Sequence, residues 1–467
     1  MRRLRVLAVI PGLLAAAAAA LALSGQASGD RQHGQPSWWK PPADVRKALA
    51  AVDARSLERY DRALVGFGTR HTLSDQDDPN RGIGAARDYI FEQFTQIAAG
   101  TGGRMTVELQ SYIQEPADRI PEPTRITNVV ATLRGTDPAS ADRVYVVGAH
   151  YDSRVTDVLN ATDDAPGAND DGSGTSAVIE LARVLAKVDS EATIVFVAFA
   201  GEEQGLYGSN HFAELAKQNG WNIQGVLNMD IIGSPVGGNG AREPFTVRLF
   251  SEGVPTSETP QETARRQSIG GENDGVSRQL ARYVKETGEN RATGMEVKLV
   301  WRRDRFLRGG DQISFLERGW PGVRFTEPNE NFDHQHQDVR VEDGRQFGDL
   351  LEFVDFRYVA RVTRVVGSSL SALARAPRAP RNARIITASL SYDTELRWDA
   401  NPEPDVVGYE IVWRDSTEPL WTKSRRFGNV TAATIEGLNK DDFQVGVRAI
   451  DRDGNKSPVA YPIPADE

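Results

Sequence analysis

Short apolar runs that alternate with helical patterns constrain the fold of this chain more than any other feature. Three of these runs are apolar on both faces: Val144–His150, Thr193–Ala200 and Gly225–Gly233. A strand has this composition when helices cover both faces of its sheet. Residues 174–188, between the first two runs, place apolar side chains at helical spacing. The sequence therefore predicts an α/β fold with a mixed, largely parallel sheet flanked by helices.

The segments around these runs extend the pattern. Met105–Ile113 and Ile126–Gly135 alternate between apolar and polar residues, as half-buried strands do. Residues 45–94 have helical spacing, and we expect a further helix over Asp274–Thr287. We therefore expect one α/β domain over residues 45–375, which ends in a long amphipathic helix.

The pattern changes after a proline- and arginine-rich hinge at Ala374–Arg384. Short alternating strands separated by turn signals follow, and this spacing is typical of a β-sandwich. We expect a separate all-β sandwich over residues 379–467. Leu396–Trp398 and Gly408–Arg414 resemble strands of a fibronectin type III domain, which would bind a surface or another protein.

The amino terminus has the pattern of an export signal. Arginines at positions 2, 3 and 5 precede an apolar stretch, Val6–Leu23, and small residues follow it. We expect a signal peptide over residues 1–27 and export to a periplasm or the extracellular space. The alternative is an uncleaved membrane anchor, because the apolar stretch approaches bilayer-spanning length. Residues 28–44 are polar and proline-rich, and we expect a linker there.

Composition excludes several classes of partner and site. The chain has 467 residues and a formal net charge of −10, without a basic stripe of the kind that binds phosphate, so we expect no nucleic-acid partner. It contains no cysteine, which excludes disulfides and thiolate metal ligands. No later apolar stretch reaches spanning length, so we expect no stable membrane insertion after signal cleavage.

Candidate metal ligands lie where the apolar runs end, which is where functional groups collect in open α/β sheets. The candidates are His150 and Asp152 after the first run, Asp170 in the glycine-rich loop Pro166–Gly174, Glu202 and Glu203 after the second run, Asp230 in the third run, and His334 and His336 in a later loop. Each alone has a structural alternative, such as a helix cap or a solvated helix start. Converging carboxylates repel each other without cations. Their joint occurrence therefore predicts a metal site.

The motifs GAHYDS, PGANDDGSG, FAGEEQGLYGS and NMD occur in this order. Together they resemble the co-catalytic zinc aminopeptidases of peptidase family M28, and the likeness to exported bacterial members covers roughly Leu49–Leu373. The resemblance implies a zinc exopeptidase-like fold. It also implies an enzyme that hydrolyses N-terminal residues from peptides or proteins.

The resemblance further implies a role for each candidate residue. The metal ligands would be His150, Asp170, Glu203, Asp230 and His336, with Asp170 shared between two zinc ions. Glu202 would bind no metal and would act as the general base on a metal-bridging water. Asp152 would orient His150. We prefer His336 to His334 as the last ligand, because a spacer and an acid follow it.

Ligands of this kind suit zinc, although carboxylate-rich sites also accept manganese or cobalt. We expect two Zn²⁺ ions per chain. The alternatives are an exopeptidase of another end specificity, a one-zinc enzyme like the glutaminyl cyclases, and a catalytically silent binding relative. One zinc would favour cyclisation and two would favour hydrolysis. A silent relative would be expected to lose Glu202 or a ligand, and this chain has all six positions.

The chain departs from the family pattern near the last ligand. Gln335 stands where the family often has a tyrosine that stabilises the oxyanion. The candidates for a substitute donor are Arg303, Arg305 and Tyr151. Gln312 stands where the family usually has a histidine after the residue that corresponds to Asp311, which would still shape the site.

Overall fold

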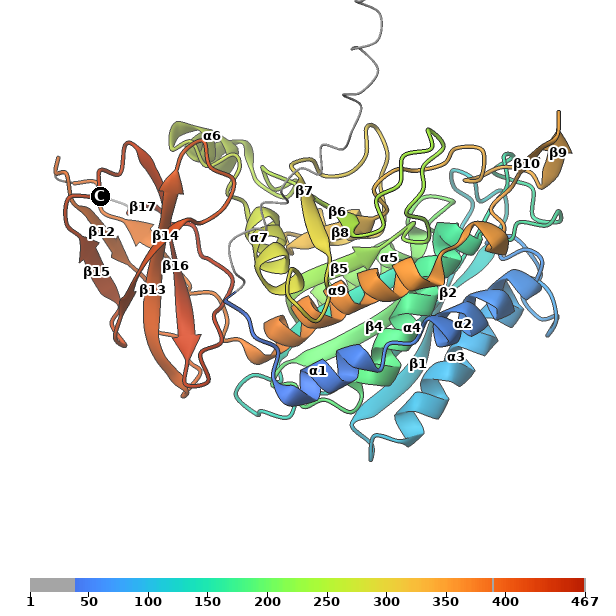
Figure 1. Cartoon of the computed structure of the whole chain (residues 1–467), viewed down its shortest axis with the longest axis horizontal. Coiled ribbons are helices and arrows are strands. Elements are labelled where there is room, and N and C mark those ends of the chain that lie inside the picture. Colours follow the sequence, from blue (N-terminus) through green and yellow to red (C-terminus); the bar gives the residue numbers. More distant parts are fainter. Residues whose placement is uncertain (1–37, 389, 466–467) are drawn as a thin grey trace, which may run out of the picture. The chain divides into compact units, whose positions relative to one another are not determined.

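The computed structural model describes residues 38–388 and 390–465, and an eight-stranded mixed sheet forms its centre (Figure 1). The strand order is β1-β2-β4-β3-β5-β8-β6-β7. The strands are β1 (Met105–Gln114), β2 (Thr124–Leu133), β3 (Arg143–His150), β4 (Thr193–Phe199), β5 (Asn222–Met229), β6 (Thr246–Ser251), β7 (Glu296–Val300) and β8 (Gly322–Thr326). The central neighbours β4, β3, β5 and β8 are parallel, whereas β1, β2 and β6 pair antiparallel with β2, β4 and β8. The predicted mixed, largely parallel sheet is therefore confirmed.

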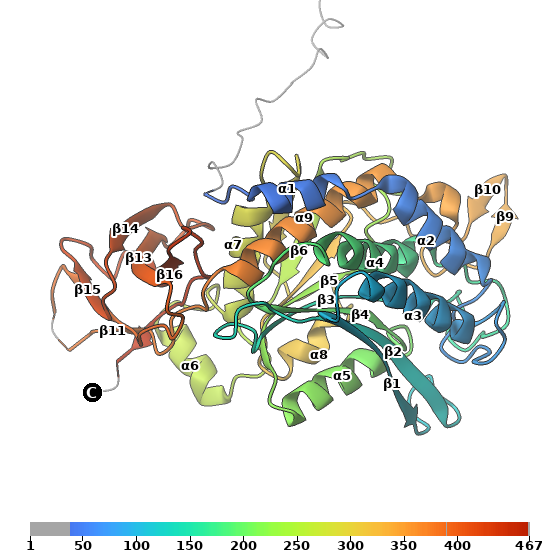
Figure 2. The ribbon, with the colours of Figure 1, turned by 90° about the horizontal axis from the view of Figure 1, so that it is seen from below.

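Helices cover both faces of this sheet (Figure 2). One face carries α1 (Ala43–Ala50), α2 (Ala54–Gly66), α3 (Ile83–Ala99), α4 (Gly174–Leu185), α7 (Val276–Gly288) and α9 (Phe356–Arg375). The other face carries α5 (Tyr207–Gln218) and α8 (Gln312–Leu316). Smaller elements are α6 (Pro260–Ser268), β9 (Arg340–Glu342), β10 (Arg345–Phe347) and the 3₁₀ turn η2 (Leu351–Phe353). Within the described part of the chain, no helix combines the length and the apolar character needed to cross a membrane.

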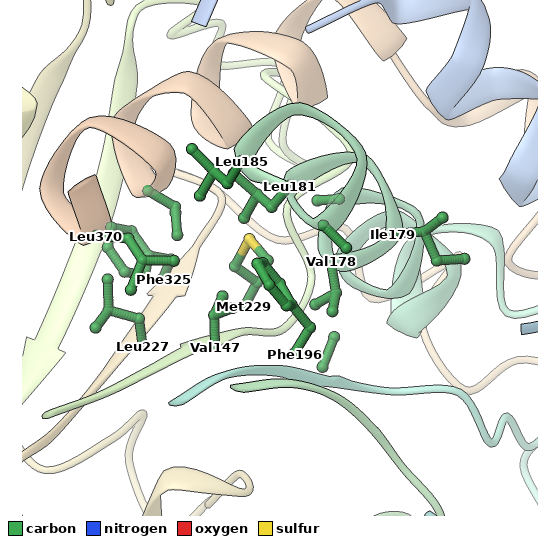
Figure 3. Close-up of a cluster of buried hydrophobic side chains, with 14 of the residues drawn as sticks. Val147, Val178, Ile179, Leu181, Leu185, Phe196, Leu227, Met229, Phe325 and Leu370 are labelled. Atoms are coloured by element: carbon green, nitrogen blue, oxygen red, sulfur yellow. The ribbon is translucent and has the colours of Figure 1, made fainter. Parts of the chain in front are cut away.

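The central strands are apolar on both faces because each face packs against its own helix layer. On β3, Val147 belongs to the cluster under α4 and α9, whereas Val146 belongs to the cluster under α5 and α8. Figure 3 shows the first cluster, in which Phe196 and Met229 from the sheet meet Leu181 from α4. Burying each such side chain contributes about 1.5–3 kcal/mol. This two-sided burial fixes the strand ends that carry the candidate ligands.

Two tryptophans precede α1 and pack against the domain. The Trp39 side chain is buried, and the ring of Trp38 lies edge-to-face on Tyr283 of α7 with centroids 5.9 Å apart. The last residues of the linker expected over residues 28–44 therefore belong to the packed structure. The signal peptide predicted over residues 1–27 lies outside the described residues.

The chain after α9 forms two small β-sheets, as the predicted all-β segment requires. Their orders are β15-β12-β11-β17 and β14-β13-β16, and all pairs are antiparallel except β11 with β17. The strands are β11 (Arg384–Ile385), β12 (Thr394–Arg397), β13 (Val406–Asp415), β14 (Lys423–Phe427), β15 (Ala432–Ile435), β16 (Phe443–Asp451) and β17 (Ile463–Pro464). Their inward side chains, including Trp398 and Tyr409, form a hydrophobic cluster of their own.

A buried acid joins these sheets to the α/β domain. The carboxylate of Asp274, just before α7, lies 3.1 Å from Arg282 and 2.7 Å from Arg414 of β13. Trp301 packs under the guanidinium groups of Arg278 and Arg282. Trp301 therefore belongs to this contact region rather than to the cleft described below.

Candidate metal centre

Three neighbouring strand ends bring the predicted ligands to one edge of the sheet. His150 ends β3, Glu203 lies four residues after β4, and Asp230 directly follows β5. Because β4, β3 and β5 are adjacent and parallel, their carboxyl ends share one edge. The chain leaves β3 for β4 on one side and then returns to β5 on the other, so the strand order reverses at this point. Such a reversal opens a crevice at the carboxyl ends.

A tight loop adds Asp170 to this edge. The loop is the π-helical turn η1 (Ala168–Ser173), which precedes α4. The carboxylate of Asp349 accepts the backbone N–H groups of Asn169 and Asp170, the latter at 2.7 Å. Gly167 has φ of +51°, and an added Cβ there would lie 2.5 Å from the Ser153 side chain. The glycine is therefore required for the loop to approach β3 so closely.

The five predicted ligands form two donor sets that share Asp170. In the first set, Nε2 of His150 lies 3.1 Å from Oδ1 of Asp170 and 3.9 Å from Oδ1 of Asp230. In the second set, Nε2 of His336 lies 2.9 Å from both Oδ2 of Asp170 and Oε1 of Glu203. The donor atoms of each set lie within 4.8 Å of one another. One imidazole and two carboxylates per set match the ligand types of zinc.

Burial makes these carboxylates depend on a cation. Asp170, Glu203 and Asp230 are at most 5% exposed, and Oε1 of Glu203 faces Nε2 of His336 at 2.9 Å. Burial opposes ionisation of Glu203, yet neighbouring His336 and Arg154 lower its pKa to about 2. Burial likewise opposes protonation of His336, yet Glu203 and Asp170 raise its pKa to about 10. A proton on His336 thus stabilises the carboxylates of Asp170 and Glu203, as a metal ion at the same place would. The residues present therefore fit a bound cation.

Glu202 behaves differently from its neighbour. Its side chain is half-buried at the cleft wall, and it belongs to neither donor set. Burial raises the pKa of Glu202 well above its ordinary value, and the negative charges of Asp230 and Glu203 add to the effect. A carboxylate with a raised pKa accepts a proton readily. Of the two adjacent glutamates, Glu203 therefore belongs to a donor set and Glu202 does not.

Asp152 connects the ends of β3 and β4. Its carboxylate accepts the backbone N–H groups of Glu202 at 3.3 Å and Glu203 at 3.1 Å, and the hydroxyl of Thr72 at 3.1 Å. The Nδ1 atom of His150 lies 3.1 Å from the backbone oxygen of Asp152 and 3.5 Å from its carboxylate. Asp152 therefore contacts both the His150 ring and the backbone that carries the two glutamates.

Two arginines beside the donor sets were missed by sequence reasoning. Arg154 lies 2.9 Å from Oε2 of Glu203 and 2.5 Å from Nδ1 of His336. Arg324 of β8 lies 2.7 Å from Oδ1 of Asp230 and is fully buried. A charged residue inside the apolar strand Gly322–Thr326 was the available signal for Arg324. Arg154, which directly follows the GAHYDS motif, had no signal apart from that position.

The structure separates the two late histidines. His336 belongs to the second donor set, whereas the His334 ring stacks on Phe353 with centroids 3.7 Å apart. The preference for His336 therefore agrees with the geometry. Gln335, between them, donates from Nε2 to Oδ2 of Asp170 at 2.9 Å. The amide thus supports the shared carboxylate.

The three candidate oxyanion donors differ in their position relative to the cleft. The hydroxyl of buried Tyr151 donates to the backbone oxygen of Thr127, so it points away from the site. Arg303 is exposed and does not line the cleft, whereas Arg305 does line it. Asp311 is buried close to His150 and Asp230, where burial raises its pKa to about 7.

The donor sets open into a cleft of about 380 Å³. Its lining includes the carboxylates of Asp170, Glu202, Glu203 and Asp230, the ring of His336, and the segment Gln204–Leu206. Because the unligated Glu202 and both donor sets face the same space, a molecule bound there would contact the metal and the base together.

Known proteins that resemble this chain in sequence belong to the class of metal-dependent peptidases. A model of peptidase family M28 matches residues 128–342. A protein named a probable zinc metalloprotease from Leptosphaeria maculans is 50% identical, over 91% of this chain and 98% of its own length. Another of that name from Pyricularia oryzae is 51% identical, over 91% of this chain and 85% of its own length. These relatives are fungal and give no support for the bacterial source that we expected.

A solved structure shares the fold. LapB from Legionella pneumophila matches with a TM-score of 0.50 and 18% sequence identity, over 73% of this chain and 77% of that chain. At that sequence identity the likeness shows the fold alone. The assignment to a family rests on the sequence relatives. The chain is a metallopeptidase that belongs to peptidase family M28.

Proposed function

We propose that this metallopeptidase holds two zinc ions and removes N-terminal residues from peptides. The observation that carries the proposal is the position of Asp170, whose two carboxylate oxygens face different donor sets. His150 and Asp230 complete one set, and Glu203 and His336 complete the other. Manganese or cobalt would be accepted by the same ligands.

Zinc ions bound there would polarise a carbonyl and lower the pKa of water. The chain's own contribution is the placement and proton transfer that follow. Glu202 would accept a proton from the attacking water and deliver it to the leaving amine. Asp152 would hold the backbone of Glu202 in place while this proton moves.

The size and charge of the cleft support an exopeptidase. A cleft of about 380 Å³ suits one or a few residues rather than a long extended chain. Asp118 and Glu202 on its lining would attract the positively charged N-terminal amine of a substrate. These two carboxylates favour an aminopeptidase over an exopeptidase that acts at the other end.

We also propose the expected organisation around this activity. The signal-like residues 1–27 would direct export, residues 45–375 would carry the hydrolase, and residues 379–467 would bind a surface or another protein. The sequence patterns described above support these assignments. Peptide or protein N-termini would be the partners, with no nucleic acid and no stable membrane insertion.

A panel of aminoacyl chromogenic substrates, assayed before and after chelation, tests the proposed function. We expect hydrolysis that chelation abolishes and that two equivalents of zinc per chain restore. Full activity with one zinc would favour the cyclase-like alternative, which glutamine-terminated peptides would then reveal. Binding of zinc without turnover of any substrate in the panel would favour a silent relative.

A further inference from the structure

Three arginines line the cleft wall beyond the donor sets, Arg119, Arg305 and Arg308, together with the acid Asp118. Among the described residues that line this cleft, Leu206 is the only large apolar side chain. A pocket for an apolar substrate residue is lined mainly by hydrophobic side chains. The wall therefore has the wrong chemistry for an apolar residue and the right chemistry for an anionic group.

The acids behind this wall do not neutralise it. Glu330 accepts three guanidinium groups, from Arg248 at 2.9 Å, Arg305 at 3.1 Å and Arg308 at 2.8 Å. Burial opposes ionisation of Glu330, but these arginines outweigh it and lower its pKa. One negative charge among three positive ones leaves this cluster of four side chains net positive.

A second acid behind the wall is also shared. Asp304 lies 3.2 Å from Arg305 and 2.8 Å from Arg324, and Arg324 is already committed to Asp230. Asp304 thus offsets part of the positive charge of the wall, and Asp118 and Glu202 on the cleft lining offset more of it. An arginine of the wall with unused guanidinium N–H groups would still donate them to a substrate carboxylate.

Arg308 has guanidinium nitrogens that can meet a ligand. Within the described residues, its hydrogen bonds all leave from Nη1, which meets Glu330 at 2.8 Å and Oε1 of Gln335 at 3.3 Å. Its Nε and Nη2 atoms stay available, and its side chain is 31% exposed. The three nitrogens of Arg305 are instead all used, by Asp304, Glu330 and Gly309.

Arg308 also lies close to the reacting centre. Gln335, which accepts from Arg308, donates at 2.9 Å to Oδ2 of Asp170. A group bound by Arg308 is therefore only one side chain away from the carboxylate that the donor sets share. Arg119 lines the same cleft and donates from Nη1 to the backbone oxygen of Glu203 at 2.9 Å.

We propose that this wall is a carboxylate subsite, with Arg308 as its specificity-determining residue, and that the enzyme prefers short peptides with a carboxylate next to the scissile bond. The proposal rests on the proposed hydrolysis. Two sources of the carboxylate fit the same chemistry: an acidic N-terminal side chain, or the C-terminal carboxylate of a dipeptide. Charge-assisted hydrogen bonds to guanidinium favour the charged ligand over its neutral amide by about 10- to 100-fold.

Matched pairs of charged and neutral substrates test the subsite. One arm compares glutamyl and glutaminyl p-nitroanilides, and the other compares leucyl-glycine with leucyl-glycinamide. In the zinc-loaded protein, we expect kcat/KM to favour the charged member at least tenfold in one arm. Arg308→Gln should bring that ratio close to one, and Arg308→Lys should keep part of it. Arg397→Gln, at a 61% exposed arginine on β12, is the matched control and should keep the whole ratio.

Calorimetry separates failure of the subsite from failure of the hydrolysis. L-Glutamate and L-glutamine differ only in the side-chain carboxylate, and their binding needs no turnover. If the glutamyl p-nitroanilide is preferred, we expect glutamate to bind more tightly than glutamine, and Arg308→Gln to remove that difference. If only leucyl-glycine is preferred, we expect glutamate and glutamine to bind equally. Ratios near one in both arms with equal binding would overturn the proposal. So would an Arg308→Gln variant that loses charged and neutral substrates equally, since Arg308 would then serve the reaction itself.

Discussion

The Nε2 atom of His150 lies 3.1 Å from Oδ1 of Asp170, although β3 carries one residue and the loop before α4 carries the other. This contact uses one carboxylate oxygen of Asp170 and leaves the second for His336. In the proposed dinuclear site, each of these oxygens would bind one cation.

The two adjacent glutamates should fail in different ways. Glu202→Gln removes the proposed base but leaves both donor sets, so we expect zinc content to stay at the wild-type level while kcat falls about 10²- to 10⁴-fold. Glu203→Gln removes a ligand, so we expect loss of metal from the second set. Elemental analysis beside steady-state kinetics measures both effects. Turnover near the wild-type rate in Glu202→Gln would remove Glu202 from the mechanism.

The two late histidines should also differ. His336→Ala should lose one metal per chain, because Asp170 and Glu203 alone would remain in the second set. His334→Ala should keep its metals, because the His334 ring packs on Phe353 and faces neither set. Metal content after dialysis against a dilute chelator measures this. The reverse result would move the ligand to His334.

The sequence was most informative about the central strands and the residues at their ends. The runs ending at His150, Ala200 and Gly233 are strands because both of their faces are apolar, and their ends carry ligands because parallel strands share an edge. The shared edge places His150, Glu203 and Asp230 near one another, whereas the roles of Asp170 and His336 came from the family resemblance. The division of labour between Glu202 and Glu203 came from the family resemblance.

Other features depend on contacts that no local pattern encodes. Asp349 holds the loop of Asp170 from a distant segment, and its neighbours in sequence give no sign of that partner. The arginine cluster around Glu330 combines Arg248 of β6 with Arg305 and Arg308 of the loop before α8. Trp39 looked like part of a polar linker because its burial depends on helices that follow much later.

Asp152 should affect metal affinity by positioning the His150 ring and the backbone of both glutamates. Asp152→Asn would place an amide N–H₂ against one of the backbone N–H groups that its carboxylate now accepts. We expect metal affinity to fall about 10- to 100-fold, as for other residues that orient a metal-bound histidine. Zinc titration against a competing chelator measures the change. Asp189→Asn, at an acid whose side chain is 83% exposed, should leave the affinity unaltered.

The C-terminal sheets should support stability more than catalysis. Deleting residues 379–467 removes none of the cleft lining, so we expect hydrolysis of small aminoacyl amides to persist. Arg414→Ala leaves buried Asp274 with Arg282 as its remaining ion-pair partner, and we expect unfolding free energy to fall by about 3 kcal/mol. Urea unfolding measures this, with exposed Arg397→Ala as the control. A truncated chain that folds and binds zinc but hydrolyses nothing would mean that these sheets shape the site.

A buried acid on β13 should make stability depend on pH. Burial opposes ionisation of Glu410, but Arg448 and Lys456, at 2.7 and 2.9 Å, lower its pKa from 4.5 to about 2. The unfolded chain therefore binds the extra proton first as the pH falls. The stabilisation is complete above about pH 4.5 and is lost towards pH 2. Glu410→Gln should flatten this part of the curve of urea midpoint against pH, whereas Glu395→Gln, at a half-buried acid on β12, should not. Parallel curves for Glu410→Gln and wild type would contradict this.

The central claim is that Asp170 is shared between two metal ions, and anomalous scattering at the zinc edge from crystals of the zinc-loaded protein tests it most directly. We predict two peaks, one beside His150 and Asp230 and one beside Glu203 and His336, with one oxygen of Asp170 bound to each. A single peak at full zinc occupancy, or two peaks without Asp170 between them, would contradict the account.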